Sequence, residues 1–124
     1  MQFTADVITG SGNGKKLGFP TVNLNTSSVP EDLCEGVYAC FARLGNYGLR
    51  LPAAMHYGAR PTLGDTRSCE VHVIDHAVEF PPRTVTVDVV EKLRDVQNFG
   101  SKEALIAQLK QDIAHARTVL CVPC

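Results

Sequence analysis

Residues 10–23 combine the kinds of group that bind a chain of phosphates. Glycines in this stretch precede a pair of lysines: Gly10, Gly12, Gly14, Lys15 and Lys16. Glycine lets backbone N–H groups approach an anion closely, and successive amides in such a loop form a concave anion site. The lysine ammonium groups add point charges that attract phosphate. The stretch therefore predicts a phosphate-binding loop.

Thr21 and Asn23 follow this loop and are two positions apart. Alternate side chains of an extended chain point to the same face, so the hydroxyl and the amide oxygen are expected to face one way. Such hard oxygen ligands suit Mg²⁺, which takes few ligands from protein and the rest from nucleotide phosphates and water. Pro20, whose ring fixes its φ, holds the entry to the pair. We expect Thr21 and Asn23 to bind a phosphate-bound Mg²⁺.

The pattern of this segment leaves one alternative open. It lacks the Gly-x-x-x-x-Gly-Lys-Ser/Thr order of a Walker A loop, and no helix is expected directly after it. On composition alone, the glycines and lysines also fit a surface hairpin in which they are simply solvated.

Glu70 is the candidate proton acceptor. Alternation around it predicts a strand with Val71 and Val73 on one face and with Glu70, His72 and Ile74 on the other. Phosphoryl transfer needs metal-held phosphates, an oriented hydroxyl and a carboxylate that accepts the hydroxyl proton. The alternative for Glu70 is an exposed carboxylate of the scaffold. For His72, a hydrogen-bonded position in the sheet is favoured over metal binding.

The elements that must position these residues are short strands followed by one helix. Alternating and β-branched stretches predict strands at residues 2–9, 36–43, 50–57, 69–75 and 84–93. After a capping Ser101, apolar residues recur at helical spacing, at Leu105, Ile106, Leu109, Ile113, Ala116 and Leu120. The order predicts a mainly β fold, a small closed antiparallel barrel with a C-terminal α-helix packed against it.

Length and composition predict one globular domain over residues 1–124. The net charge of −1 provides no general attraction to nucleic acid or to anionic membranes, and no apolar run approaches the roughly 18 to 20 residues of a membrane span. Five cysteines, an odd number, fit a reducing cytoplasm better than a secreted disulfide scaffold. The Cys-x-x-Cys at the end is interpreted as part of a disordered tail, residues 121–124, rather than as a metal or redox site.

The first motif, Gly10-x3-Gly14-x2-Leu17-Gly18-Phe19-Pro20-Thr21-x-Asn23, resembles the signature of the ATP-using riboflavin kinases of bacteria and eukaryotes. Later blocks resemble the same family in the same order, at Gly36-Val37-Tyr38-Ala39, Gly58-x-Arg60-Pro61-Thr62, Glu70-x-His72-x-x-Asp75 and Leu93-Arg94-Asp95-x-x-x-Phe99. The resemblance extends from Val7 to Leu120 and implies a Greek-key β-barrel of about six strands with a C-terminal helix. It also implies Mg²⁺-dependent transfer of the ATP γ-phosphate to the 5′-hydroxyl of riboflavin, giving FMN and ADP.

The resemblance implies a role for each matching residue. It places the nucleotide against the glycine loop and the residues that follow it, which are Gly12, Gly14, Lys15, Lys16, Gly18, Pro20, Thr21 and Asn23. Thr21 and Asn23 are the implied Mg²⁺ ligands, and Glu70 is the implied catalytic base. Arg94 and Phe99 are the implied riboflavin-binding residues. The implied partners are riboflavin and ATP, with no nucleic acid and no membrane, for a monomer in the cytoplasm.

The sequence departs from the family pattern at two places outside the loop. His56-Tyr57 stands where the family usually has Asn-Ile, and Pro81-Pro82 stand near the point where Tyr-Gly usually opens a strand. These departures motivate an alternative, a non-catalytic flavin- or nucleotide-binding barrel derived from such a kinase. A nucleic-acid-binding barrel is disfavoured, because the chain lacks a basic face with interleaved aromatic residues. Many bacterial members carry an adenylyltransferase domain before the kinase, and the sequence leaves open whether this chain is a stand-alone kinase or one excised domain.

Overall fold

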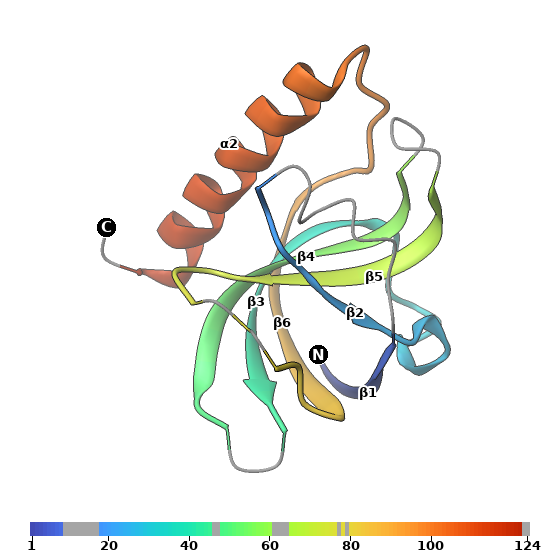
Figure 1. Ribbon diagram of the computed structural model, residues 1–124, viewed down its shortest axis with the longest axis vertical. Helices are drawn as coiled ribbons and strands as arrows, with labels where there is room; N and C mark the ends of the chain where they lie inside the picture. Colours follow the sequence, from blue (N-terminus) through green and yellow to red (C-terminus); the bar gives the residue numbers. More distant parts are fainter. Residues whose placement is uncertain (9–17, 46–47, 61–64, 77, 79, 123–124) are drawn as a thin grey trace.

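The computed structural model describes residues 1–8, 18–45, 48–60, 65–76, 78 and 80–122. Within these ranges six strands close into an antiparallel barrel in the order β1-β2-β5-β4-β3-β6, and a long helix, α2, lies against its outside (Figure 1). The strands are β1 (Gln2–Ile8), β2 (Val22–Leu24), β3 (Gly36–Leu44), β4 (Arg50–Arg60), β5 (Asp65–Val73) and β6 (Thr84–Arg94). A 3-10 turn, η1 (Thr26–Ser28), follows β2, and the helix is α2 (Lys102–Leu120). The predicted barrel with a C-terminal helix is confirmed.

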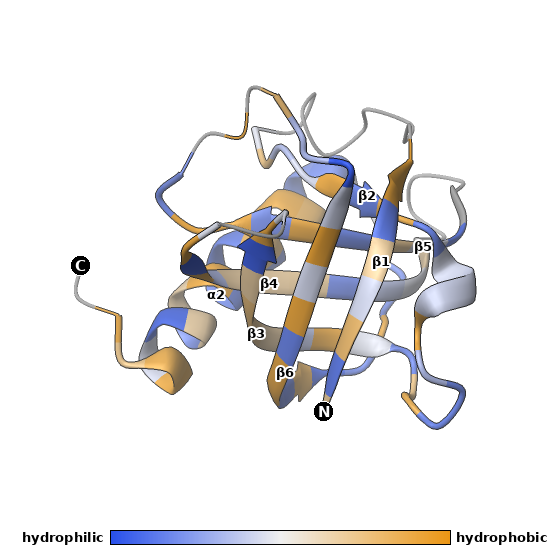
Figure 2. Cartoon of the chain, turned by 90° about the horizontal axis from the view of Figure 1, so that it is seen from below, coloured by the Kyte–Doolittle hydropathy of each residue, from blue (hydrophilic) through white to orange (hydrophobic). Residues whose placement is uncertain are grey.

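Alternation along the strands separates the barrel interior from its outer face. Val71 and Val73 of β5 are buried in the interior, and Glu70 and His72 lie on the other face, as predicted. The largest side chains that are fully buried come from β2, β3, β4, β5 and β6: Leu24, Cys40, Met55, Cys69, Val71, Val85 and Val87. Figure 2 shows this alternation of apolar and polar residues along β6. The interior is therefore a packed apolar core, and any site must lie outside it or at its ends.

The strand-by-strand prediction omits β2, which is only three residues long. The first and last residues of β2, Val22 and Leu24, are buried in the core. Asn23 between them faces outward, opposite Glu70 of β5. A stretch this short, flanked by Pro20 and Asn25, has too few positions for an alternation to stand out. The consequence for the site is direct, because β2 places Asn23, one of the predicted metal ligands, beside β5, and Thr21 directly precedes the strand.

Helix α2 covers the outer face of β3 and β4. Its Ala116 and Leu120 pack with Ala39, Ala54 and Ile74 in a second apolar cluster outside the barrel. The predicted cap is confirmed, since the Ser101 side chain accepts a hydrogen bond of 3.1 Å from the backbone N–H of Ala104. Within the described ranges, no helix combines the length and the apolar character that a membrane crossing needs.

Two ion pairs attach α2 to the barrel. Asp112 in the middle of the helix accepts hydrogen bonds of 2.8 Å each from Nε and Nη2 of Arg94, at the end of β6. Near the end of the helix, Arg117 donates to both carboxylate oxygens of Asp75, in the turn after β5. Such forked pairs fix orientation as well as distance. They hold α2 at a set height above the sheet.

Backbone hydrogen bonds close the C-terminal end of α2. Cys121 adopts a left-handed conformation with φ of 57°, and its N–H donates to carbonyls of the last helical turn. The N–H of Val122 donates to the carbonyl of Arg117 at 2.9 Å. These bonds satisfy carbonyls that a helix end would otherwise leave without partners. The disordered tail that the sequence predicts for residues 121–124 stays a prediction. Residues 123–124 lie outside the described ranges.

We expect Asp112→Asn to lower the free energy of unfolding by about 2 kcal/mol, because it leaves the Arg94 guanidinium without its counter-charge in a nearly enclosed place. The side chains of Arg94 and Asp112 are only 14% and 5% exposed, and asparagine keeps one acceptor oxygen. Urea unfolding measures the change. Asp88→Asn is the matched control, because its partner Arg50 is 51% exposed and a surface pair contributes at most about 1 kcal/mol. Equal effects of the two substitutions would contradict a structural role for the Arg94–Asp112 pair.

Candidate active site

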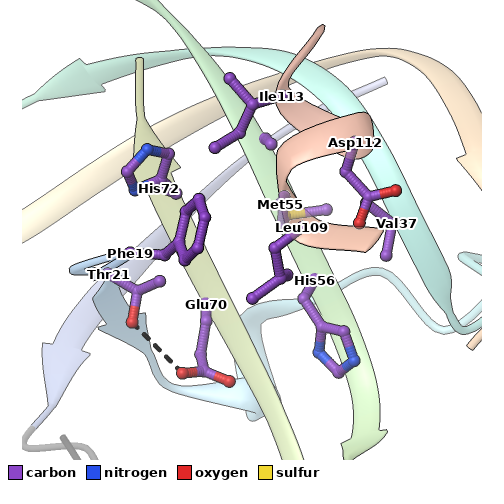
Figure 3. Close-up of a pocket in the computed structure, with 11 residues that line it drawn as sticks. Phe19, Thr21, Val37, Met55, His56, Glu70, His72, Leu109, Asp112 and Ile113 are labelled. Atoms are coloured by element: carbon purple, nitrogen blue, oxygen red, sulfur yellow. Dashed lines mark hydrogen bonds between the residues drawn. The ribbon is translucent and has the colours of Figure 1, made fainter. Parts of the chain in front are cut away.

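A cavity lies between the outer face of the barrel and α2 (Figure 3). The empty space in and at the mouth of this cavity amounts to about 420 Å³, part of it open to solvent. Apolar side chains from the segment before β2, from the sheet and from the helix form most of its wall: Phe19, Val37, Ala54, Met55, Leu109 and Ile113. Apolar walls of this kind favour a ligand with a largely apolar surface.

A row of paired residues crosses four strands beneath this cavity. Asn23 of β2 is opposite Glu70 of β5, Glu70 is opposite His56 of β4, and His56 is opposite Val37 of β3. Directly opposed residues of antiparallel strands place their side chains on the same face, with Cβ atoms about 4.5 to 5.5 Å apart. The register therefore gathers an amide, a carboxylate and an imidazole at one end of the cavity. Figure 3 shows the Glu70 carboxylate between Thr21 and His56.

Glu70 is held by two hydroxyl groups. Its Oε1 accepts a hydrogen bond of 3.2 Å from Thr21, and its Oε2 accepts one of 3.0 Å from Ser68. The residue is only 3% exposed, and its side chain lines the cavity. The alternative that Glu70 is an exposed scaffold carboxylate is therefore wrong. A buried carboxylate requires such donors, and here they also fix the direction of its two oxygens.

The thiol beside Glu70 in sequence takes no part in this site. Cys69 points into the barrel core, where burial and then the neighbouring Glu70 charge raise the pKa of its thiol to about 12. The thiolate is the nucleophilic form of cysteine, so a thiol with this pKa stays protonated and inert near neutral pH. The chemistry of the cavity belongs to its oxygen and imidazole groups.

Thr21 separates the first cavity from a second one. The second cavity has about 300 Å³ of empty space, part of it open to solvent, and lies where core residues of β2 and β5 meet the segment before β6. Besides Thr21, its lining consists of Pro20, Val22, Val71, Val73, His76, Val78 and Pro81. Thr21 is the residue common to both linings. A group bound at its hydroxyl would be within reach of ligands in either cavity.

The segment before β2 is fastened to β5 through His72. Nδ1 of His72 lies 2.8 Å from the carbonyl oxygen of Pro20, which can only accept, so Nδ1–H is the donor. The ring of Phe19 meets the imidazole edge-on, with 5.9 Å between the ring centroids. The expectation that His72 is a hydrogen-bonded sheet residue is confirmed. Gly18 begins the segment with φ of 86°, a conformation that glycine adopts without strain.

The predicted site residues are only partly brought together. Thr21, Asn23 and Glu70 lie on one face of neighbouring strands, with Gly18 and Pro20 at the entry to β2. The predicted phosphate residues Gly12, Gly14, Lys15 and Lys16 lie outside the described ranges.

Arg94 and Phe99 do not line the first cavity. Arg94 is bound to Asp112, and its guanidinium carbon lies 5.5 Å from the centroid of the Phe99 ring. The sequence-based prediction missed the helix side of the cavity, formed by Leu109, Asp112 and Ile113. The signal was present, because a carboxylate on the apolar face of an amphipathic helix requires a buried partner or a functional role.

The oxygen ligands beside Glu70 suit a magnesium ion that also binds phosphate. Among the described residues, no group of three or more His, Cys, Asp or Glu side chains is arranged to hold a metal ion. The groups beside Glu70 that can offer oxygen to a metal are instead the Thr21 hydroxyl and the Asn23 amide. Mg²⁺ accepts few protein oxygens and completes its six ligands with phosphate and water. The residues present therefore fit a Mg²⁺–nucleotide complex better than a metal site built from protein alone.

Comparisons with known proteins identify the family and the fold. The family model Flavokinase, described as riboflavin kinase, matches residues 1–120. The chain is 35% identical over 112 residues to the bifunctional riboflavin kinase/FMN adenylyltransferase of Escherichia coli (strain K12), covering 90% of this chain and 35% of that protein. It is 32% identical over 123 residues to the riboflavin kinase of Homo sapiens, covering 94% of this chain and 79% of that protein. The crystal structure of riboflavin kinase from Trypanosoma brucei has the same fold, with a TM-score of 0.62 at 21% identity, covering 98% of this chain and 80% of that one.

Proposed function

The chain belongs to the riboflavin kinase family, and we propose that it transfers the γ-phosphate of ATP to the 5′-hydroxyl of riboflavin, giving FMN and ADP. The observation that carries the proposal is the placement of Glu70, a buried carboxylate at one end of the cavity and hydrogen-bonded to the threonine that adjoins both cavities. The chain spans 35% of the length of the bacterial bifunctional relative, so the proposal concerns the kinase reaction alone.

Riboflavin occupies the cavity under α2 in this proposal. Its isoalloxazine ring is flat and largely apolar, and it packs between the sheet face and the helix residues Leu109 and Ile113. The polyol chain then extends toward the polar end of the cavity, where Glu70 lies. This orientation brings the 5′-hydroxyl to the carboxylate and leaves the ring among apolar side chains.

ATP occupies the second cavity, with its γ-phosphate at Thr21. Because Thr21 lines both cavities, a phosphate bound there lies between the nucleotide and the flavin. Thr21 and Asn23 would hold Mg²⁺, which neutralises charge on the phosphates when bound. We assign the remaining phosphate contacts to the glycine loop, with Gly12, Gly14, Lys15, Lys16 and Gly18, and the wall beside the nucleotide to Pro20.

Glu70 acts as the general base. As the 5′-oxygen of riboflavin forms its bond to the γ-phosphorus, the bond from that phosphorus to the bridging oxygen of ADP breaks, and the hydroxyl proton passes to the carboxylate. Thr21 and Ser68 each donate to one oxygen of Glu70 and so aim it at the cavity. Helix α2, which lines the flavin cavity, limits access of water to the ring side of the site, and water would otherwise compete as the acceptor.

Arg94 and Phe99 act on riboflavin indirectly in this scheme. Arg94 fixes Asp112, and Asp112 belongs to the helix wall of the flavin cavity. The cytoplasmic location and the monomeric state that the sequence predicts stay predictions.

Product analysis tests the proposal. Purified protein with riboflavin, ATP and Mg²⁺ is expected to form FMN and ADP in equal amounts. Chromatography of the flavins and nucleotides measures both products. Tight riboflavin binding without FMN, whatever nucleoside triphosphate or divalent ion is supplied, would instead support the non-catalytic flavin- or nucleotide-binding barrel.

A further inference from the structure

His56 is a buried imidazole beside the proposed base. It is 8% exposed, lines the flavin cavity and is directly opposite Glu70 in the pairing of β4 with β5. Its other neighbour along the row is Val37, which is apolar. The His56 side chain therefore lies on the same face of the sheet as Glu70 and lines the same cavity, on the side of Glu70 away from Thr21.

We propose that His56 is a substrate-contacting residue that hydrogen-bonds an inner hydroxyl of the polyol chain of riboflavin. The inference rests on the proposed function, because that function places the chain end at Glu70. Directly opposed side chains have Cβ atoms about 4.5 to 5.5 Å apart, which is a few carbon atoms along an extended polyol. A chain whose 5′-hydroxyl meets Glu70 thus presents an earlier hydroxyl to His56.

The chemistry of imidazole suits such a contact. Its two ring nitrogens include one donor and one acceptor in the neutral form, so one ring can bond a hydroxyl in either direction. Its place in the cavity lining, directly opposite Glu70, puts the ring where it can distinguish a hydroxylated chain from an apolar one.

The contact predicts selectivity between two flavins with the same ring. Lumiflavin carries a methyl group where riboflavin carries the polyol chain. We expect His56→Leu to weaken riboflavin binding about tenfold, equivalent to about 1.4 kcal/mol, as for the loss of one hydrogen bond. Lumiflavin binding should stay within about twofold of the parent, because leucine preserves the bulk of the wall. His56→Asn keeps a donor and an acceptor at the same strand position and should retain most of the riboflavin affinity.

Quenching of flavin fluorescence on titration with protein, in the presence of ADP and Mg²⁺, measures both dissociation constants. Ile113→Ala is the matched control, because it removes apolar wall and should weaken riboflavin and lumiflavin by the same factor. A thermal melt of each variant verifies that it is folded. If His56→Leu does not fold, the affinities of His56→Asn for the two flavins are compared with those of the parent instead.

The outcomes separate this inference from the proposed function. If the parent forms FMN and the His56 variants bind riboflavin as the parent does, the contact is wrong and the kinase assignment stands. Equal weakening of both flavins by His56→Leu also overturns the inference, since it would mark His56 as part of the wall only. If the parent forms no FMN, the proposed function fails, whatever the flavin affinities are.

Discussion

Glu70→Gln is expected to lower kcat by about a thousandfold while leaving the affinity for riboflavin nearly unchanged. A positioned general base contributes on the order of 10² to 10⁴ in rate, because the attacking hydroxyl must lose its proton as the bond to phosphorus forms. Glutamine keeps the shape and one oxygen of the side chain but cannot accept that proton. The loss is therefore confined to the transition state and should appear in kcat rather than in binding. Steady-state formation of FMN gives kcat, and flavin fluorescence gives the affinity.

The fold of this variant should be preserved. The Thr21 and Ser68 hydroxyls that donate to Glu70 can each rotate to accept from an amide, so their hydrogen bonds need not be lost. Asp88→Asn is the control for removal of a carboxylate elsewhere on the sheet, since Asp88 pairs with Arg50 at the surface. If Glu70→Gln turned over within a few-fold of the parent, Glu70 would not be the base.

Thr21→Val should lower kcat/KM for ATP by about a hundredfold at limiting Mg²⁺. Valine keeps the β-branched shape beside β2 but removes the hydroxyl that is proposed to bind the metal and that now donates to Glu70. Removing one fixed polar contact to a transferring group typically costs a factor of about 10² to 10³. The dependence of the initial rate on Mg²⁺ at several ATP concentrations measures the effect.

Thr21→Ser provides the matched control for this prediction. Serine restores the hydroxyl without the methyl group, so it should recover most of the lost activity. Raising Mg²⁺ should partly rescue Thr21→Val and leave the serine variant almost unaffected. A valine variant with the same Mg²⁺ dependence as the parent would remove Thr21 from the metal site.

The residues on regular strands were those that the sequence could place. Alternation through Val71 and Val73 is enough to put Glu70 on the outer face of β5, and the structure has it there. What alternation cannot supply is the pairing of strands far apart in the chain. Strands β3 and β4 lie between Asn23 and Glu70 in the sequence, and only the pairing of β2 with β5 makes the two residues neighbours.

The roles of Arg94, Asp112 and His56 depend on that tertiary arrangement. Arg94 belongs to a recognisable motif, but the motif does not reveal that its guanidinium bonds a carboxylate on α2. The helical pattern predicts that Leu109 and Ile113 share one face, but not that this face meets a cavity rather than a filled core. His56 was visible as a departure from the family pattern, and its position opposite Glu70 follows only from the register of β4 with β5.

The site of phosphorylation tests the central claim most directly. The protein is incubated with Mg²⁺, ATP labelled in its γ-phosphate, and either riboflavin or 5′-deoxyriboflavin, and the label in the flavin fraction is counted. The account predicts one labelled phosphate per riboflavin converted and none on 5′-deoxyriboflavin, although both flavins bind. Label on the deoxy compound, or no label on riboflavin that is demonstrably bound, would contradict the assignment of Glu70 and Thr21 to transfer at the 5′-hydroxyl.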